Sequence, residues 1–143
     1  MPGRYEDFET VSSEIKRLKI DEVICLATWD EIKLKSLPYY TAIQSNMNGW
    51  RQRMFPIPNF GAPSDKQKFL QIVKDLAQQL LSGKKLLIHC GGGIGRTGTL
   101  ATGLLLSLGV EAEKAKKTAA SAHSFPETTS QEQILDWLEL KLK

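Results

Sequence analysis

Cys90 and Arg96 are separated by a loop with four glycines among five residues, Gly91-Gly92-Gly93-Ile94-Gly95. Glycines permit backbone conformations with positive φ, so successive N–H groups of such a loop can point inward at one centre. A tetrahedral oxyanion at that centre would also meet the planar, two-pronged guanidinium of Arg96. The segment therefore predicts an oxyanion-binding loop with the sulfur of Cys90 at its base.

The dipoles that would bind an oxyanion also favour Cys90 as a thiolate, because they lower the pKa of a nearby thiol. A thiolate beneath a bound phosphate is placed for in-line attack on phosphorus, which makes Cys90 a candidate nucleophile. The Thr97 hydroxyl could stabilise the sulfur when a phosphocysteine breaks down, and His89 is expected to hold the loop by hydrogen bonds rather than to react. A Walker-type nucleotide loop is excluded, because no Gly-Lys-Ser/Thr follows the glycines. The alternative is a glycine-rich turn in which Cys90 is a packed apolar thiol.

This loop is expected to connect a strand to a helix. Lys85–His89 is a short apolar run typical of a strand buried on both faces, and Thr97–Leu108 has the composition of a buried helix. A second compact apolar run, Val23–Ala27, predicts another buried strand. Met54–Pro58 predicts a strand that runs into a loop, since its two prolines cannot sit in a central ladder.

Helical periodicity covers most of the remaining chain. We expect helices over Asp7–Leu18, Tyr39–Met47, Ser64–Gly83 (with Ser64 as N-cap), Glu111–Ser121 and Thr129–Leu142. Strands separated by helices of this length imply crossover connections and a mostly parallel sheet. We therefore predict an α/β fold, in which a central, mostly parallel sheet of about four to five strands is flanked by helices.

Length and composition restrict the class of protein. The chain has 143 residues, 41% hydrophobic and 24% charged, which predicts one soluble domain over residues 1–143 and, in our interpretation, a monomer. We expect a cytoplasmic protein without membrane contact, because no apolar run reaches the roughly 18 residues of a span and the N-terminus lacks a signal-peptide core. Two cysteines and two histidines, without a Cys-x-x-Cys pair, argue against a zinc site. A net charge of +3 and scattered tryptophans argue against nucleic acid.

The sequence His89-Cys90-x5-Arg96-Thr97-Gly98 resembles the signature loop of the protein tyrosine phosphatase superfamily, and the short spacing elsewhere is similar to its compact dual-specificity branch. The resemblance covers nearly the whole chain. It implies a phosphatase-like three-layer fold, no metal and no organic cofactor. It also implies Cys90 as the nucleophile, Arg96 as the phosphate clamp and Thr97 as the hydroxyl partner of the thiolate. The backbone amides of Gly91–Arg96 would then bind the phosphate oxygens.

The segment Pro56–Pro63 resembles the mobile loop that supplies the family's general acid, an aspartate, but the matching residue here is Asn59. An amide cannot donate the proton that a leaving alkoxide or phenolate needs, and loss of a general acid costs about 10²–10⁴-fold in rate. Asp65 or a water molecule could supply the proton, although an acidic residue in the first turn of a helix is favourable without any catalytic duty. Alternatively, the substrate needs little help, as a phosphoanhydride does, or the chain binds or traps its partner.

The segment Glu127–Gln131 is similar to the family's late loop, in which a glutamine positions the hydrolytic water. The resemblance implies this role for Gln131, and Gln133 is the neighbour that could replace it. Members of the family often carry an arginine just before this loop, where this chain has Ala122-His123-Ser124. His123 could be an alternative acid, although a lone histidine in a loop is typical of a surface residue.

Together these features predict a cysteine-dependent phosphatase that hydrolyses phosphomonoesters through a phosphocysteine. No long insertion deepens the pocket, so we expect a shallow site that accepts phosphotyrosine and phosphoserine/threonine of a protein or peptide. One alternative is a phosphate-binding module that turns over slowly or not at all, which Asn59 favours. Another is an RNA 5′-triphosphatase-like enzyme, which would not need the acid.

Overall fold

Three short strands form a parallel sheet in the computed structural model, which describes residues 1–143. They are β1 (Glu22–Cys25), β2 (Arg51–Met54) and β3 (Leu86–His89), in the order β2-β1-β3. In this register Ile24 pairs with Arg53 on one side and with Ile88 on the other. The mixed α/β class and the parallel sheet predicted from the sequence are confirmed.

The sheet has three strands, so the prediction of four to five was wrong. The second strand is Arg51–Met54, not the predicted Met54–Pro58. The chain does continue beside β1, since the amides of Phe55 and Ile57 donate to carbonyls at its end. Pro56 and Pro58 have no N–H to donate, and regular pairing stops before them.

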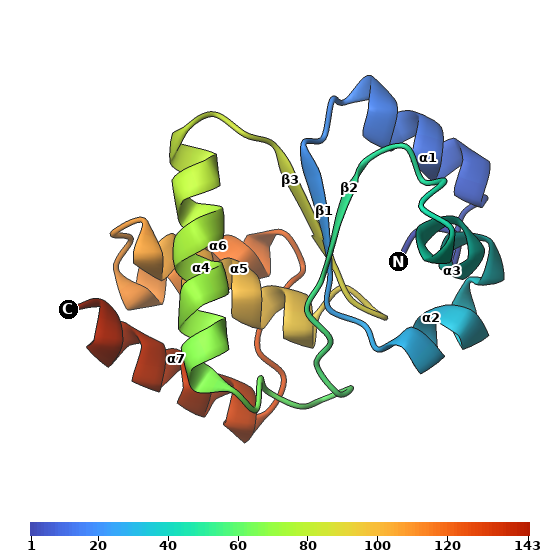
Figure 1. Ribbon diagram of the computed structural model, residues 1–143. Coiled ribbons are helices and arrows are strands. Elements are labelled where there is room, and N and C mark those ends of the chain that lie inside the picture. The colour runs from blue at the N-terminus through green and yellow to red at the C-terminus, as the bar shows by residue number, and fades with distance from the viewer.

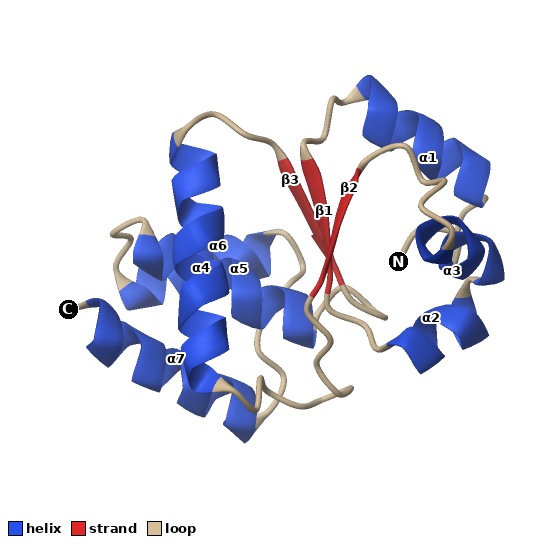
Figure 2. Cartoon of the chain, in the orientation of Figure 1, coloured by secondary structure: helices blue, strands red, loops and turns tan.

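Seven helices complete the chain. They are α1 (Phe8–Arg17), α2 (Trp29–Lys35), α3 (Leu37–Gln44), α4 (Lys66–Leu81), α5 (Gly95–Ser107), α6 (Ala112–Ser121) and α7 (Thr129–Leu142). Helices α1–α3 lie on one side of the sheet and α4–α7 on the other, which gives the three layers that the resemblance implied (Figures 1 and 2). None of the helices combines the length and the apolar character needed to cross a bilayer.

The helices differ from the predictions in several places. Helices α1, α3 and α5 have other bounds than the predicted Asp7–Leu18, Tyr39–Met47 and Thr97–Leu108. Helix α2 was not predicted; its N-cap Thr28 and Glu31 form a reciprocal capping box. At the start of α4 the N-cap is Asp65 and not Ser64, because the Asp65 carboxylate accepts a hydrogen bond from the Lys68 amide at 3.1 Å. A carboxylate at this position also interacts favourably with the helix dipole.

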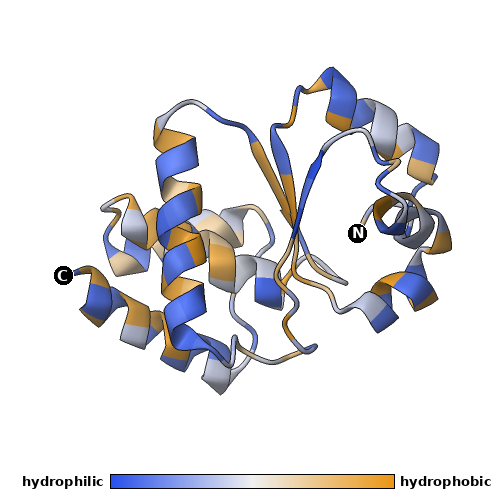
Figure 3. Ribbon diagram, in the orientation of Figure 1, coloured by the Kyte–Doolittle hydropathy of each residue, from blue (hydrophilic) through white to orange (hydrophobic).

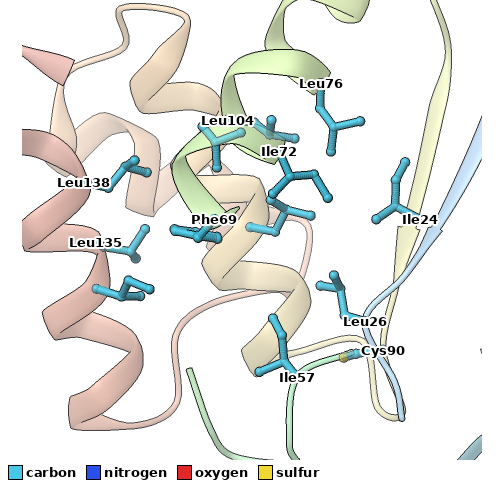
Figure 4. Packing of buried hydrophobic residues seen from close by; sticks show 13 residues of the cluster. Ile24, Leu26, Ile57, Phe69, Ile72, Leu76, Cys90, Leu104, Leu135 and Leu138 are labelled. Carbon is cyan, nitrogen blue, oxygen red and sulfur yellow. The ribbon is translucent and has the colours of Figure 1, made fainter. Parts of the chain in front are cut away.

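Alternate residues at the end of β1 and in the two positions after it contribute to two apolar clusters on opposite sides of the sheet. Ile24 and Leu26 belong to a cluster of 13 buried residues beneath α4, α5 and α7, which also reaches Cys90 (Figure 4). Cys25 and Ala27 belong to a cluster of five on the side of α1–α3. Strand β2, in contrast, is hydrophilic (Figure 3). Charged side chains on an edge strand discourage pairing with another chain.

The parallel arrangement brings the carboxyl ends of all three strands to one edge of the sheet. Thr28 and α2 follow β1, the segment Phe55–Pro63 follows β2, and Cys90 follows β3. This edge is where open α/β sheets bind their ligands. The residues predicted to do chemistry are thus delivered to one place by the topology of the sheet.

Candidate active site

The loop from Cys90 to Arg96 leaves β3 and enters α5 at Gly95. Gly93 has φ +77°, a left-handed conformation that favours glycine, and its N–H donates to the Cys90 sulfur at 3.1 Å. Two distant segments hold the loop from outside. Arg4 Nη1 donates to the Gly91 carbonyl at 2.5 Å, and Ser124 Oγ donates to the Gly93 carbonyl at 2.6 Å.

The environment of Cys90 favours the thiolate. Burial raises the pKa of the Cys90 thiol, but the nearby hydroxyl and amide of Thr97, the hydrogen bond from the Gly93 amide and the charge of Arg96 together outweigh it. The net result is a pKa below the ordinary value of a thiol. The Thr97 hydroxyl is buried near the sulfur and has no hydrogen-bond partner in the structure, so it is free to donate to the thiolate. Cys90 thus combines a place at the edge of the apolar cluster with a lowered pKa, a property that a nucleophilic cysteine requires.

Arg96 is held in place by a carboxylate that the sequence did not single out. Its Nη1 and Nη2 donate to the two oxygens of Glu31 at 2.7 and 2.8 Å, and Nη1 also donates to the Ile57 carbonyl at 2.8 Å. Burial raises the pKa of Glu31, but the hydrogen bonds and charge of Arg96 lower it to about 2. Glu31 thus stays ionised, and the Nε–H and the second Nη2 N–H of Arg96 remain for an oxyanion.

His89 supports the loop from behind, as expected. Its Nδ1 lies 3.4 Å from the Cys90 carbonyl, and its Nε2 lies 2.7 Å from the Tyr39 hydroxyl, which itself accepts from Gln52 at 2.7 Å. A carbonyl can only accept, so Nδ1 carries the proton and Nε2 accepts from Tyr39. Burial lowers the pKa of His89 to about 3, so the ring is neutral at physiological pH.

A pocket of about 220 Å³ opens above Cys90. Of the residues predicted for the site, six line this pocket: Asn59, Cys90, Gly92, Ile94, Gly95 and Arg96. Five further lining residues were not predicted for it: Arg4, Tyr5, Lys35, Phe60 and Glu127. The structure therefore brings the loop of Asn59 next to the signature loop, and it adds two basic side chains and one acidic side chain around the same opening.

Gln131 lies below the surface and does not line the pocket. It is fully buried, its Oε1 accepts from the Glu127 amide at 2.8 Å, and its Nε2 donates to the Gly61 carbonyl at 2.9 Å. Its side-chain amide thus joins the late loop to the loop of Asn59. Its neighbour Gln133 is exposed on α7.

Neither of the other two candidate acids lines the pocket above Cys90. The Asp65 carboxylate caps α4 and borders a separate surface depression with Met54 and Phe55. His123 is exposed, with φ 61°, just after α6.

The missed residues differ in how they could have been found. Glu31 had a local signal, because Thr28-Trp29-Asp30-Glu31 has the spacing of a capping box and so marks a helix start. Lys35 lies one turn further along the same helix, 3.6 Å from Glu31. Arg4, which also lies over the ring of Tyr5 at 4.6 Å, had none, since it is 87 residues from its partner Gly91.

Comparison with known families agrees with this geometry. The family model described as "PTP-SAK: Swiss Army Knife protein, DSP-PTPase phosphatase domain" matches residues 2–140. The chain belongs to this phosphatase family. The resemblance noted in the sequence is thereby confirmed, and the domain's three layers are those of the dual-specificity phosphatase fold.

Individual relatives of this phosphatase domain lie at moderate distance. Cyclin-dependent kinase inhibitor 3 of Rattus norvegicus is 33% identical over 97 residues, which cover 68% of this chain and 45% of the relative. The chain thus matches less than half the length of that curated relative. The structure of Tk-PTP in its active form has a TM-score of 0.77 and 32% identity, covering 93% of this chain and 86% of that chain. A kinase associated phosphatase with a substituted catalytic-site cysteine has a TM-score of 0.82 at 24% identity, over 99% and 84%, and supports the fold alone.

Proposed function

We propose that the protein is a cysteine-dependent phosphatase that hydrolyses phosphomonoesters through a phosphocysteine. The observation that carries the proposal is the pairing of a thiol with a lowered pKa, Cys90, with a buried guanidinium, Arg96, in one glycine-rich loop. Amides of this loop and the free N–H groups of Arg96 would bind the three non-reacting phosphate oxygens. Such donors stabilise the charge that spreads over these oxygens in the transition state.

In the first step the Cys90 thiolate attacks phosphorus, the S–P bond forms, and the bond to the leaving oxygen breaks. In the second step water attacks the phosphocysteine, and phosphate leaves as the S–P bond breaks. The Thr97 hydroxyl supports the departing thiolate, because it is buried beside the sulfur without another partner. Gln131 acts in this scheme by holding the late loop over the site through its bond to the Glu127 amide.

The substrate that fits this site best is a phosphorylated side chain of a protein or peptide. Arg4 and Lys35 border the pocket and would attract an anionic segment, and the rings of Tyr5 and Phe60 are 73% and 60% exposed at the same opening. Exposed aromatic rings at a pocket are suited to contact an aryl phosphate or a peptide. The name of one relative, cyclin-dependent kinase inhibitor 3, favours a protein partner over other phosphate esters.

The test is to trap the covalent intermediate. The protein is mixed with a phosphotyrosine peptide, the reaction is quenched in acid within milliseconds, and the intact mass of the protein is measured by mass spectrometry. The steady-state release of phosphate is measured in parallel. We expect a phosphoryl adduct and turnover for the natural chain and for Cys25→Ser, and neither for Cys90→Ser. Cys25 is the matched control because it is the other cysteine and is fully buried.

Asn59 supports one second candidate, a module that captures a phosphorylated partner without releasing it, because this amide lines the pocket where an acid is expected. Tight binding of the phosphopeptide with no adduct and no phosphate release would support that module and contradict the phosphatase. Hydrolysis confined to a triphosphate-ended RNA would also contradict the proposed phosphomonoesterase and would support a triphosphatase.

A further inference from the structure

The loop of Asn59 leaves the proposed reaction without a proton donor, since an amide cannot protonate the leaving oxygen. Among the residues that line the pocket above Cys90, Glu127 is the only carboxylate. We propose that Glu127 is the general acid of the first step and the general base of the second. This inference rests on the proposed phosphatase function and assigns the proton transfers that the function requires.

The late loop that carries Glu127 is fastened to the signature loop. Ser124 Oγ donates to the Gly93 carbonyl at 2.6 Å, and the Phe125 amide donates to the Ile94 carbonyl at 3.1 Å. Both bonds precede Glu127 by only two or three residues in the chain. The position of Glu127 is therefore fixed relative to the loop that would bind the phosphate.

The carboxylate itself lies over Gly95, the first residue of α5. A Cβ atom at position 95 would overlap Oε1 of Glu127, so the glycine makes room for that oxygen. Gly95 also lines the pocket. An oxygen of Glu127 is thus at the wall of the site, on the side where the phosphate-binding loop ends.

Gln131 adds a second constraint on Glu127. It accepts from the Glu127 amide at 2.8 Å and donates to the Gly61 carbonyl at 2.9 Å, two residues after Asn59. The late loop is therefore held beside the loop that resembles the family's acid loop. In this arrangement the Asn59 amide can donate a hydrogen bond to the substrate while Glu127 transfers the proton.

The other ionisable groups at the pocket are poorly suited to this transfer. They are Arg4, Tyr5, Lys35, Cys90 and Arg96. Guanidinium, ammonium and phenol groups are much weaker acids than a carboxyl. Lys35 and Arg96 are also engaged by Glu31, and Cys90 is the nucleophile. Glu127 is thus the one carboxyl at this opening that could transfer a proton to a departing phenolate.

The proton balance is complete within the site. As the Cys90 sulfur bonds to phosphorus and the P–O bond breaks, the protonated Glu127 carboxyl gives its proton to the leaving oxygen. Glu127 is then a carboxylate. In the second step it takes a proton from the attacking water, the P–O bond to that water forms, the S–P bond breaks, and the carboxyl is restored.

The experiment compares Glu127→Gln with the natural chain on phenyl phosphate and on 4-nitrophenyl phosphate. The nitrophenolate leaves without protonation, whereas the phenolate needs a proton. We expect kcat/KM for phenyl phosphate to fall by about 10²-fold or more, with a much smaller loss for the nitrophenyl ester. Glu132→Gln is the matched control, because Glu132 is on the adjoining helix, pairs with Lys116 and does not line the pocket.

The ratio of kcat/KM for the two esters separates an acid from a residue that only holds the loop in place. The ratio cancels effects that the esters share, such as formation of the thiolate. We expect this ratio, phenyl over nitrophenyl, to be lower in Glu127→Gln than in the natural chain, because only the phenolate needs the proton. Equal losses on both esters, or no loss, would overturn the role of Glu127 while the phosphatase function stands. No turnover or adduct with either ester in the natural chain would instead overturn the function.

Discussion

The two sides of the sheet are built from different chemistry. Toward α4–α7 the core is a cluster of 13 buried residues, 12 of them aliphatic or aromatic side chains together with Cys90. Toward α1–α3 the apolar cluster has five residues, and polar contacts lie beside it: Tyr39 with His89, and Glu31 with Arg96. Both polar contacts end on the signature loop or the residue before it.

This difference suggests that one side of the sheet mainly stabilises the fold and the other mainly orients the site. Each large apolar side chain that is fully buried stabilises the fold by about 1.5–3 kcal/mol, so the larger cluster supplies most of the folding free energy. Buried polar pairs contribute little net stability but fix geometry, since their partners must meet at defined distances and angles. The side of α1–α3 therefore acts mainly to orient Arg96 and the loop around Cys90.

The largest effect on stability is expected in the larger cluster. Leu76→Ala, at a fully buried position of α4, should lower the free energy of unfolding by about 2–5 kcal/mol, because it removes apolar contacts and leaves a cavity. The kcat/KM of the folded fraction should not change. Urea unfolding and kinetics below the melting range check both. A large fall in kcat/KM without a fall in the free energy of unfolding would contradict the assignment of stability to this cluster.

Glu31→Gln should have the opposite signature. Arg96 loses its charged partner, and a small displacement of a positioning group can cost about 10²-fold in rate, so we expect kcat/KM to fall by that order. Glu14→Gln is the control, since it changes the same pair of residue types, with Arg17 at 2.7 Å, on the exposed surface. The control should keep its kcat/KM. An unchanged kcat/KM in Glu31→Gln would mean that Arg96 is oriented without the charge of Glu31.

The polar side should also be the more sensitive to acid. Burial lowers the pKa of His89 to about 3, so as pH falls below the ordinary histidine pKa the unfolded chain binds a proton that the folded chain does not. Stability from this group is complete above about pH 6.5 and is lost toward pH 3, by at most about 1.4 kcal/mol per pH unit. Urea unfolding against pH should show a shallower slope for His89→Gln.

Thr97→Ala should give the smallest effect. The Thr97 hydroxyl helps to lower the pKa of Cys90 against burial, so its loss should raise that pKa and reduce the thiolate fraction at acidic pH. The rate of inactivation by iodoacetamide can be measured from about pH 5 to about pH 9. Its increase with pH should begin at a higher pH in the variant than in the natural chain. An unchanged profile would assign the stabilisation to the backbone amides alone.

The features that the sequence predicts well are local. The loop from Cys90 to Arg96 is recognisable because its chemistry lies within seven consecutive residues. The long helix α4 is recognisable because Phe69, Ile72, Val73 and Leu76 repeat with helical spacing and are all buried. In both cases one stretch of chain contains the whole signal.

The features that were missed depend on distant contacts or on weak patterns. Helix α2 has seven residues and only Ile32 is buried, so it has no periodicity to detect. Strand β2 reads Arg-Gln-Arg-Met, because an edge strand needs no apolar run, and Arg53 pairs instead with the buried Glu22 at 3.1 Å. Arg4 reaches the pocket through the three-dimensional fold, and Glu127, although it begins the segment that resembles the late loop, carries no local signal that its carboxylate lines the pocket.

The parallel topology has a consequence for how the protein acquires its activity. Contacts that complete the site join residues far apart in the chain: Arg4 and Gly91 are separated by 87 positions, Glu31 and Arg96 by 65, and Gly61 and Gln131 by 70. Such long-range contacts close large loops, and they are slow to form compared with helical turns. A partly folded chain would contain most of its helices before it contained an oriented Arg96. Catalytic competence is thus gained only at the end of folding, and recovery of activity during refolding should lag behind recovery of helical structure.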